Sequence, residues 1–251
     1  MNPRADLSHV LAFDTATEFM SVVLATPQGQ WVAEEAGGAQ ASARLIPVIK
    51  ALMAQAHCGW AALDAVAFGR GPGAFTGLRT ACSVAQGLAF GAGKPVLALD
   101  TLMAVAEDAR VRLTSQSTSA DDLWVAMDAR MNEIYAARYQ WRAGQWQVLT
   151  APHLSTAEAL NQRWRADPPV AVAGTALAAF GPQLQPGATA RCDPGALPRA
   201  AALVPLARQA WARGDVLEAL HALPSYVRDK VAQTTVERDA AKAVAAAHGR
   251  G

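Results

Sequence analysis

The feature that most restricts the fold of this chain is a pattern that occurs twice. An apolar segment ends in an aspartate, a polar turn with a glutamate follows, and a second apolar segment comes next. The two copies are LAFDTATEFMSVVL, with Asp14, and VAMDARMNEIYAAR, with Asp128. Each copy continues through a second turn into a third strand, which predicts a β-meander. Because a diverged repeat indicates a duplicated unit, we expect two lobes of like topology, each a sheet with helices packed on it.

The segments between and after the meanders predict the remaining elements. In the first half, helical spacing in SARLIPVIKALMAQA, TGLRTACSVAQGLAFGA and TLMAVAEDARVRL alternates with the short apolar strands of LDAVAFGRG and KPVLALD. In the second half, PPVAVAGTALAAFGPQL predicts a strand, a turn and a short helix, and AALVPLARQAWARGD predicts an amphipathic helix ending at Gly214. The later LPSYVRDKVA predicts an extended segment.

The polar stretch TSQSTSADD separates the two halves and predicts a loop. We expect an N-terminal lobe at 1–106, to which 222–240 returns, and a C-terminal lobe at 107–221. The alanine-rich tail at 241–251 is expected to be dispensable, and disorder is one interpretation of it.

Composition excludes several classes of protein. The 251 residues carry a net charge of only +1, so the chain has no basic excess to bind nucleic acid strongly by itself. Cys58, Cys82 and Cys192 are far apart and form no C-x-x-C, which disfavours a disulfide framework or a zinc site, so we expect buried thiols in a reducing compartment. No apolar run reaches membrane-spanning length, and Asp14 interrupts any N-terminal signal peptide. We therefore expect a cytoplasmic protein with no membrane contact.

Glycines gather where the strand of LDAVAFGRG meets the next helix. Gly69, Gly71 and Gly73 alternate through this turn, and Gly77 follows inside the helix. A glycine turn before a helix can hold an anion, but GRGPGAFTG lacks the lysine of a phosphate-binding P-loop. It also resembles G-x-G-x-x-G only loosely, and Pro72 and Phe75 would crowd a dinucleotide. The interpretation we favour is that these glycines permit close packing.

The helices at 42–56 and 76–92 present more contact surface than a sheet-facing stripe needs. In the second helix, Leu78, Ala81, Cys82, Ala85, Leu88 and Ala89 share one side and are expected to face the sheet. Arg79, Ser83, Gln86 and Phe90 lie opposite, beside Gly87, which is typical of an interaction surface. In the first helix the apolar arc is wide, and either burial or a helical partner explains it.

Catalytic signatures are few. No two histidines have the i, i+4 spacing of a metal site on a helix. Asp14 and Asp128 are either paired carboxylates across an interlobe cleft, as in an actin-like kinase or ATPase, or caps of their turns. Neither turn carries the glycine that lets a backbone wrap a phosphate. A metal-dependent hydrolase is disfavoured, because the sequence shows neither metal ligands nor a recognisable nucleophile set.

The motifs together resemble one family. LAFDTAT, SARLIPVI, GRGPGAFTGLR running into QGLAFG, MDARMNEIY and PSYVR occur in the order found in the TsaB (YeaZ) family, from residue 11 to about 232. GPGAFTGLR is highly specific, although the family more often has serine where Ala74 stands. PSYVR is a looser match to the family's Pro-x-Tyr-Leu-Arg, and the chain after Val236 lies outside the resemblance.

The resemblance implies an actin-like α/β fold of the acetate kinase, sugar kinase and heat-shock ATPase class. It also implies a non-catalytic role in making N6-threonylcarbamoyladenosine beside the tRNA anticodon. The implied partners are a TsaD-type catalytic paralogue, a TsaE-type ATPase and, through them, tRNA. The catalytic paralogue binds metal through H-x-x-x-H on the helix that corresponds to SARLIPVIKAL, which has no histidine here. The chain alone is thus expected to bind no cofactor, with ATP and metal on its partners. The isolated chain is either a monomer or a homodimer that pairs through the uncovered partner face.

The resemblance also assigns residues. Family pairing uses the first two helices, so the expected partner interface is Arg44, Leu45, Val48, Ile49, Leu52, Arg79, Ser83, Gln86, Gly87 and Phe90. The expected remnant of an interlobe cleft is Asp14, Thr15, Asp128 and Arg130. No catalytic residue and no metal ligand is expected in this chain.

Overall fold

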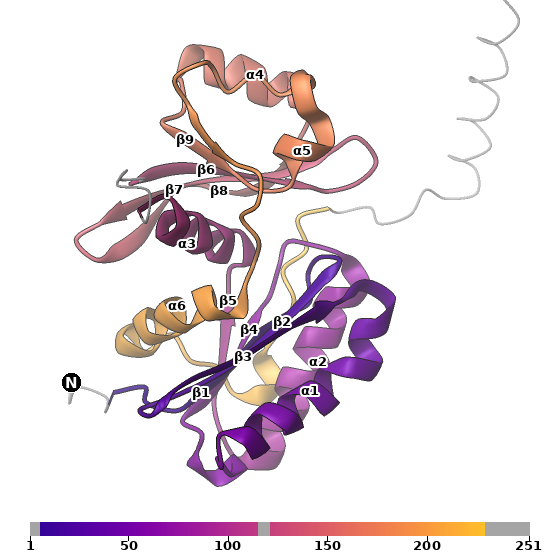
Figure 1. The fold of residues 1–251 in the computed structure, drawn as a ribbon, viewed down its shortest axis with the longest axis vertical. Helices are drawn as coiled ribbons and strands as arrows, with labels where there is room; N and C mark the ends of the chain where they lie inside the picture. The colour runs from indigo at the N-terminus through magenta and orange to yellow at the C-terminus, as the bar shows by residue number, and fades with distance from the viewer. Residues whose placement is uncertain (1–5, 115–120, 229–251) are drawn as a thin grey trace, which may run out of the picture.

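The computed structural model describes residues 6–114 and 121–228 of the chain. Two five-stranded mixed sheets form its framework, one in each half of the sequence. In Figure 1 the sheets lie one above the other, with helices between them and on their outer sides. Two sheets of equal strand order with helices on both faces are the actin-like α/β architecture expected from the repeat and the resemblance. The predicted tail at 241–251 lies outside the described residues.

The first sheet has the strand order β3-β2-β1-β4-β5. β1 pairs antiparallel with β2 and parallel with β4, so it lies at the centre. All five of its residues are buried, as expected for a central strand covered on both faces. The strands are β1 Val10–Asp14, β2 Phe19–Thr26, β3 Gly29–Ala36, β4 Ala65–Gly69 and β5 Val96–Leu99.

The second sheet repeats this order, read as β8-β7-β6-β9-β10. β6 takes the place of β1, because it pairs antiparallel with β7 and parallel with β9. Asp14 and Asp128 are the last residues of β1 and β6, which confirms that they occupy equivalent positions. The strands are β6 Asp122–Asp128, β7 Ile134–Arg142, β8 Gln145–Ser155, β9 Ala171–Ala173 and β10 Arg191–Asp193.

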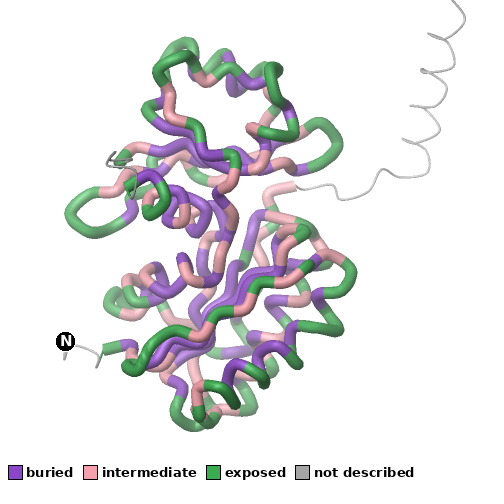
Figure 2. The backbone as a smooth tube through the Cα atoms, viewed as in Figure 1, coloured by how far each residue is buried: buried purple, intermediate pink, exposed green. Residues whose placement is uncertain are grey.

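The helices divide the apolar core into three clusters. α1 and α2 cover the outer face of the first sheet, and α4 and α5 cover the outer face of the second. α3 and α6 lie between the sheets in the largest cluster, which joins the two lobes (Figures 1 and 2). The helices are α1 Ala41–Gln55, α2 Phe75–Ala92, α3 Thr101–Thr114, α4 Ala157–Ala166, α5 Ala176–Phe180 and α6 Ala200–Arg213, with 3-10 turns η1 Gly38–Gln40, η2 Trp60–Ala62, η3 Gly181–Gln183 and η4 Ala219–His221. None of the helices in this part of the chain combines the length and hydrophobicity of a membrane span.

The chain returns to the first lobe before residue 221, which we predicted to be the end of the C-terminal lobe. α6 packs on β1, β2, β4 and β5 of the first sheet, although we expected it in the C-terminal lobe. The reason is that its apolar stripe covers the inner face of the first sheet, which α1 and α2 leave open. Residues 217–228, here called the strap, then run beside α2. Of the segment 222–240, which we expected to return to this lobe, residues 229–240 lie outside the described residues.

Two elements of the second lobe, α4 and β10, were not predicted from the sequence. α4 has a recognisable start, because Thr156 is its N-cap and its side chain accepts a hydrogen bond from the amide of Ala159 at 3.2 Å. The threonine followed by an acidic Glu158 is the signal that identifies it. β10 has only three residues and pairs with β9 alone, so it leaves no sequence pattern.

Candidate functional site

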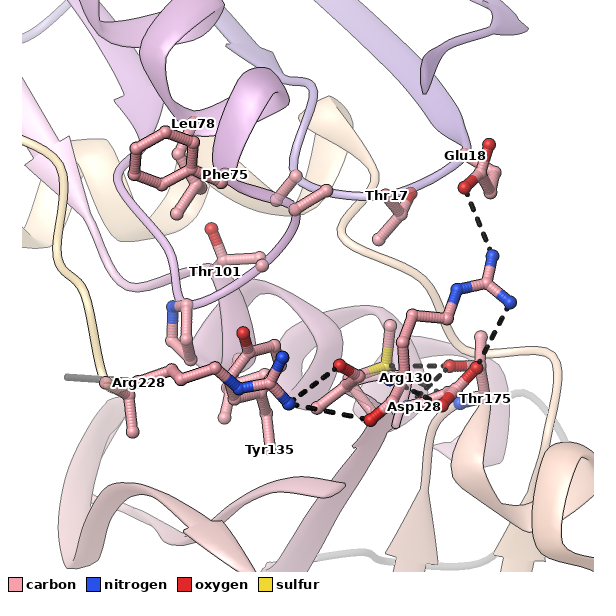
Figure 3. A pocket seen from close by; sticks show the side chains of 18 of the residues that line it. Thr17, Glu18, Phe75, Leu78, Thr101, Asp128, Arg130, Tyr135, Thr175 and Arg228 are labelled. Carbon is pink, nitrogen blue, oxygen red and sulfur yellow. Dashed lines mark hydrogen bonds and ion pairs between the residues drawn. The ribbon is translucent and has the colours of Figure 1, made fainter. Parts of the chain in front are cut away.

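A pocket of about 480 Å³ opens between the two lobes, where the repeated turns face each other. Its first wall comes from the β1–β2 turn and the start of α2, and its second from the β6–β7 turn and Thr175. The strap closes a third side with Tyr226 and Arg228, and Figure 3 shows Arg228 at this side. Most of the lining is apolar, so polar groups are concentrated at a few places.

Asp14 lies behind the first wall in a closed hydrogen-bond network. Its Oδ1 accepts from the amide of Ala16 at 2.7 Å, and its Oδ2 accepts from Oγ1 of Thr101 at 2.9 Å. Oγ1 of Thr101 in turn accepts from the amide of Gly71 at 3.0 Å. Burial raises the pKa of Asp14 from 3.8 to about 7, although both hydrogen bonds oppose the rise. The carboxyl group therefore joins β1, the glycine turn and α3 rather than facing solvent.

The glycines of the turn are used for close packing, which confirms the interpretation we favoured. A Cβ added at Gly69 would overlap Oδ2 of Asp14, and one at Gly77 would overlap the carbonyl oxygen of Thr15. A Cβ at Gly73 would lie 2.6 Å from that of Ala16. Gly71 has a φ of +112°, a backbone conformation that residues with a side chain rarely adopt. The turn is thus filled by protein atoms where a phosphate-binding loop would leave space.

The β6–β7 turn forms the open wall of the pocket. Within it, Arg130, Met131 and Asn132 have φ values of 61°, 55° and 61°, a left-handed run that is uncommon outside glycine. Oδ1 of Asp128 accepts from the amide of Arg130 at 2.9 Å, and Oγ1 of Thr175 accepts from the amide of Asp128 at 3.1 Å. Asp128 thus caps its own turn, as one of our two interpretations held.

The four residues of the expected cleft do not share one surface. Asp128 and Arg130 line the pocket, whereas Asp14 and Thr15 are buried and do not. Thr15 points its hydroxyl away, donating to the carbonyl oxygen of Gly77 at 2.7 Å. The expectation that Asp14 faces Asp128 across a cleft is therefore wrong, because packing of the glycine turn draws Asp14 inward. What does cross the pocket is an ion pair of 3.1 Å between Arg130 and Glu18, both largely exposed.

The apolar residues expected to contact a partner from α1 are in the core. Leu45 and Ile49 have no exposed surface, and Val48 and Leu52 are only 7% and 4% exposed. They pack on the outer face of the first sheet, whereas Ile46, at the edge of the same apolar arc, is 40% exposed. Burial, the other explanation of that arc, holds for these four residues. The outward side of α1 instead presents Arg44, which forms a bidentate ion pair with Glu35.

The predicted faces of α2 fit the structure better. Leu78, Ala81, Cys82, Ala85 and Ala89 are buried, and Leu88 is half-buried. Ser83, Gly87 and Phe90 are exposed on the other side, with Phe90 at 74%. Gln86 is half-buried and Arg79 is exposed, but both are bonded within the chain. The side-chain Nε2 of Gln86 donates to the carbonyl oxygen of Ala222 at 2.8 Å, and Nε of Arg79 donates to the hydroxyl of Tyr226 at 3.2 Å.

The strap that receives these bonds contains residues 223–228 of the segment predicted to be extended and to return to this lobe, but its packing on α2 was not predicted. It forms a bridge between Leu217 and Val96, and the amide of Ser225 donates to the carbonyl oxygen of Arg70 at 2.7 Å. Tyr226 stacks on Phe75 with ring centroids 5.3 Å apart, and Arg228 donates to the carboxylate of Glu133 in the second lobe. Leu220 and Leu223 remain 74% and 66% exposed beside α2. Irregular segments of this kind have no periodicity from which to predict them.

Among the described residues, no group of three or more His, Cys, Asp or Glu side chains could hold a metal ion. The cysteines are free: Cys82 is buried as expected, Cys58 is half-buried and Cys192 is exposed. The buried thiol expected at Cys192 is therefore wrong, because β10 is an edge strand that turns it outward.

Comparison with known proteins adds an independent line of evidence. A family model described as "TsaD: tRNA N6-adenosine threonylcarbamoyltransferase" matches residues 32–236. The tRNA threonylcarbamoyladenosine biosynthesis protein TsaB of Escherichia coli (strain K12) is 32% identical over 233 residues, which cover 89% of this chain and 96% of that protein. The TsaB of Haemophilus influenzae (strain KW20 / Rd) is 33% identical over 235 residues, covering 88% and 94%.

A solved structure agrees with these relatives. YeaZ from Pseudomonas aeruginosa superimposes with a TM-score of 0.77 at 37% sequence identity, and covers 87% of this chain and 99% of that one. The matched family model carries the transferase name, whereas the proteins that align from end to end are TsaB and YeaZ. With the duplicated sheet order and the packed glycine turn, these alignments establish that the chain belongs to the TsaB (YeaZ) family.

Proposed function

We propose that this chain is an accessory, non-catalytic subunit in the biosynthesis of threonylcarbamoyladenosine in tRNA. In this role it binds and activates a TsaD-type transferase, together with a TsaE-type ATPase, and meets tRNA through that complex in the cytoplasm. ATP and metal belong to the partners. Membership of the TsaB family supports the pathway, because the curated relatives are named for it.

The observation that carries the non-catalytic part is the closed state of the glycine turn. A phosphate-binding loop needs backbone amides that face open space, and here Thr15, Ala16 and the Asp14 carboxyl group fill that space. The same network holds Asp14 away from the pocket. In addition, α1 has no histidine in SARLIPVIKAL, where the catalytic paralogue carries its metal ligands.

For the partner interface we propose the outer face of α2 and the adjoining strap, defined by Ser83, Gly87, Phe90, Leu220 and Leu223. Phe90, Leu220 and Leu223 are large, apolar and exposed, which is unusual on one face of a monomer. A Cβ at Gly87 would meet no atom within 4 Å, so another helix can approach the backbone there. Leu220 and Leu223 flank Ala222, which the strap presses against α2 through Cys82 and Gln86.

Charge does not select the sign of the partner surface. The charged residues of α1 and α2 are Arg44, Lys50 and Arg79, but Arg44 is paired with Glu35 and the strap adds the exposed Glu218. We therefore propose only that the partner surface is helical and apolar at its centre.

The test is a reconstitution of tRNA modification. Purified TsaD-type transferase, TsaE-type ATPase, ATP, tRNA and the threonylcarbamoyl-adenylate donor are combined with and without this chain, and modified adenosine is measured by mass spectrometry. We expect modification and a hetero-complex on size exclusion with light scattering to require the chain. Equal modification without it, and no complex, would reduce the relationship to one of fold.

The interface is tested separately with the variant Gly87→Trp. The added indole occupies the space that a partner helix needs, so we expect weaker binding to the transferase with an unchanged unfolding midpoint. The matched control is Gly59→Trp, which also enters open space but lies outside α1, α2 and the strap. Equal affinity of Gly87→Trp and the unmodified chain would exclude this face of α2.

The competing function is an actin-like kinase or ATPase. It requires nucleotide phosphates beside Asp14 and Asp128, and the buried position of Asp14 is evidence against it. Tight binding of Mg-ATP to the isolated chain by calorimetry, with ATP hydrolysis lost in Asp14→Ala, would favour it over the accessory role.

A further inference from the structure

The strap connects the proposed partner face of α2 to the second lobe. Its first part lies on α2, where the carbonyl oxygen of Ala222 accepts from the thiol of Cys82 at 3.2 Å and from Nε2 of Gln86 at 2.8 Å. Its last residue, Arg228, reaches the β6–β7 turn of the other lobe. Both contacts lie within the segment 222–228, so a shift of the strap on α2 has a short path to that turn.

The middle of the strap is held at three successive residues. The amide of Ser225 donates to the carbonyl oxygen of Arg70 at 2.7 Å, next to the glycine turn. The ring of Tyr226 stacks on that of Phe75, and Val227 packs against the core between the two sheets. A segment that is fixed at successive residues has little slack, so a movement at one of its ends is passed to the other.

Arg228 stabilises a turn whose backbone conformation is unfavourable. Its guanidinium donates to the carbonyl oxygens of Ala129 at 3.1 Å and Arg130 at 3.5 Å. It also donates to the carboxylate of Glu133, and Figure 3 shows its side chain beside this turn. Residues 130–132 have left-handed φ values, which cost free energy in residues with a side chain. The contacts of Arg228 therefore offset part of that cost.

Two features weaken the docking of the strap. Nε of Arg228 is buried and has no hydrogen-bond partner in the described part of the chain, which costs free energy. Leu220 and Leu223 are largely exposed, so the start of the strap buries little apolar surface. Segments with few buried apolar contacts open locally at low cost. A partner that covers these two leucines would add the burial that the strap lacks.

We propose that the strap is a switch, in which covering of the partner face determines the conformation of the β6–β7 turn. When the face is covered, Ala222 stays on α2 and Arg228 fixes the left-handed turn. When the face is uncovered, the strap opens more often and the turn relaxes with it. The regulation by a partner rests on the proposed function, whereas the coupling within the chain is tested without any partner.

The first experiment uses the isolated full-length chain and a matched pair of α2 variants. Gln86→Ala removes one bond to the strap, whereas Ser83→Ala alters the same face of α2 and leaves both bonds of Ala222 in place. Hydrogen exchange is measured at the amide of Glu133, which donates to the carbonyl oxygen of Arg130 within the turn. We expect Gln86→Ala to speed this exchange about two- to tenfold, the effect of one lost hydrogen bond, and Ser83→Ala to leave it unchanged. Unchanged exchange in both variants, or equal acceleration in both, would overturn the coupling.

A variant at the other end of the strap separates the switch from a general loss of stability. Arg228→Ala removes the contact with the turn, so we expect fast exchange at Glu133 that Gln86→Ala no longer increases. The amide of Ala159, at the start of α4 in the same lobe, should exchange at one rate in all variants. Additive effects of the two substitutions at Glu133, or a parallel rise at Ala159, would mean that the strap does not join α2 to the turn.

The regulation is tested with the purified TsaD-type transferase. We expect its binding to slow exchange at Glu133 in the unmodified chain about fivefold or more, and to have little effect on that exchange in Arg228→Ala. Binding that leaves the exchange at Glu133 unchanged would overturn the switch. Absence of any binding would refute the proposed function and regulation by this partner, while the variants of the isolated chain still decide whether the strap couples α2 to the turn.

Discussion

The two halves of the molecule hold an aspartate at the same point of the same strand order, in opposite surroundings. Asp14 is 1% exposed, bonded through both carboxylate oxygens and enclosed by the glycine turn. Asp128 lines the pocket and caps a turn of three left-handed residues. A threonine approaches each, but Thr101 donates to the carboxylate, whereas Thr175 accepts from the backbone amide. After duplication, one lobe has closed its turn by packing and the other has kept it open.

The largest effect should come from adding one carbon to the closed turn. Gly77→Ala forces a Cβ into the carbonyl oxygen of Thr15, and we expect a loss of about 3 kcal/mol in the free energy of unfolding. Gly87→Ala, in the same helix but with no atom near its Cβ, should instead stabilise by about 0.5–1 kcal/mol. Urea unfolding measures both. Similar values for the two would mean that the turn is not closed.

The next effect is the pH dependence that Asp14 contributes to stability. The pKa of Asp14 in the folded chain is about 7, above its ordinary 3.8, so the folded state binds the proton more strongly. Its contribution to stability is complete below pH 3.8 and is lost as pH rises through about 7. One such group gives a slope of at most about 1.4 kcal/mol per pH unit. Asp14→Asn should remove this slope.

The control for that titration is Asp128→Asn at the open turn. Unfolding free energies are measured from pH 4 to pH 8 for both variants and the unmodified chain. If Asp14→Asn and the unmodified chain have parallel pH profiles, the carboxyl group is ionised normally, and the contrast between the two turns fails.

A smaller effect is expected where the strap joins the open lobe. Arg228 donates to Glu133 and to the carbonyl oxygen of Ala129, with its side chain 17% exposed. Arg228→Ala should cost about 1 kcal/mol, less than a fully buried charged pair because water reaches the site. Thermal unfolding measures the loss. A cost as large as that of Gly77→Ala would show that the strap, rather than the core between the sheets, holds the lobes together.

The smallest effect is expected from the ion pair across the pocket. Arg130 and Glu18 have side chains 69% and 77% exposed, so solvent screens their attraction. Arg130→Ala should change the unfolding free energy by no more than about 0.5 kcal/mol, and added salt should reduce that difference further. A larger loss that persists at high salt would mean that the open turn is fixed to the first lobe after all.

The repeat predicted the architecture because each strand and helix carries its own periodicity. It could not predict which way Asp14 turns, since that depends on how tightly Gly69 and Gly77 pack against residues 60 positions away in the sequence. The inward face of α2 was predictable from its spacing. The burial of Leu45 and Ile49 was not, because an apolar arc looks the same whether a sheet or a partner covers it. The return of residues 222–228 to the first lobe was expected, but the packing of the strap on α2 was not, because a segment without alternation gives no sign of which side chains are covered.

The position of α6 and the strap has a consequence for the order in which the protein is made. The first sheet consists of residues 10–99, yet its inner face is covered by Ala200–Arg213 and its α2 flank by residues 217–228. The earliest-synthesised lobe thus lacks its last-synthesised pieces while the ribosome is still translating. Its apolar inner face stays uncovered until the chain is almost complete, so chaperone demand during synthesis should fall on the N-terminal lobe rather than on the self-contained outer layer of the second.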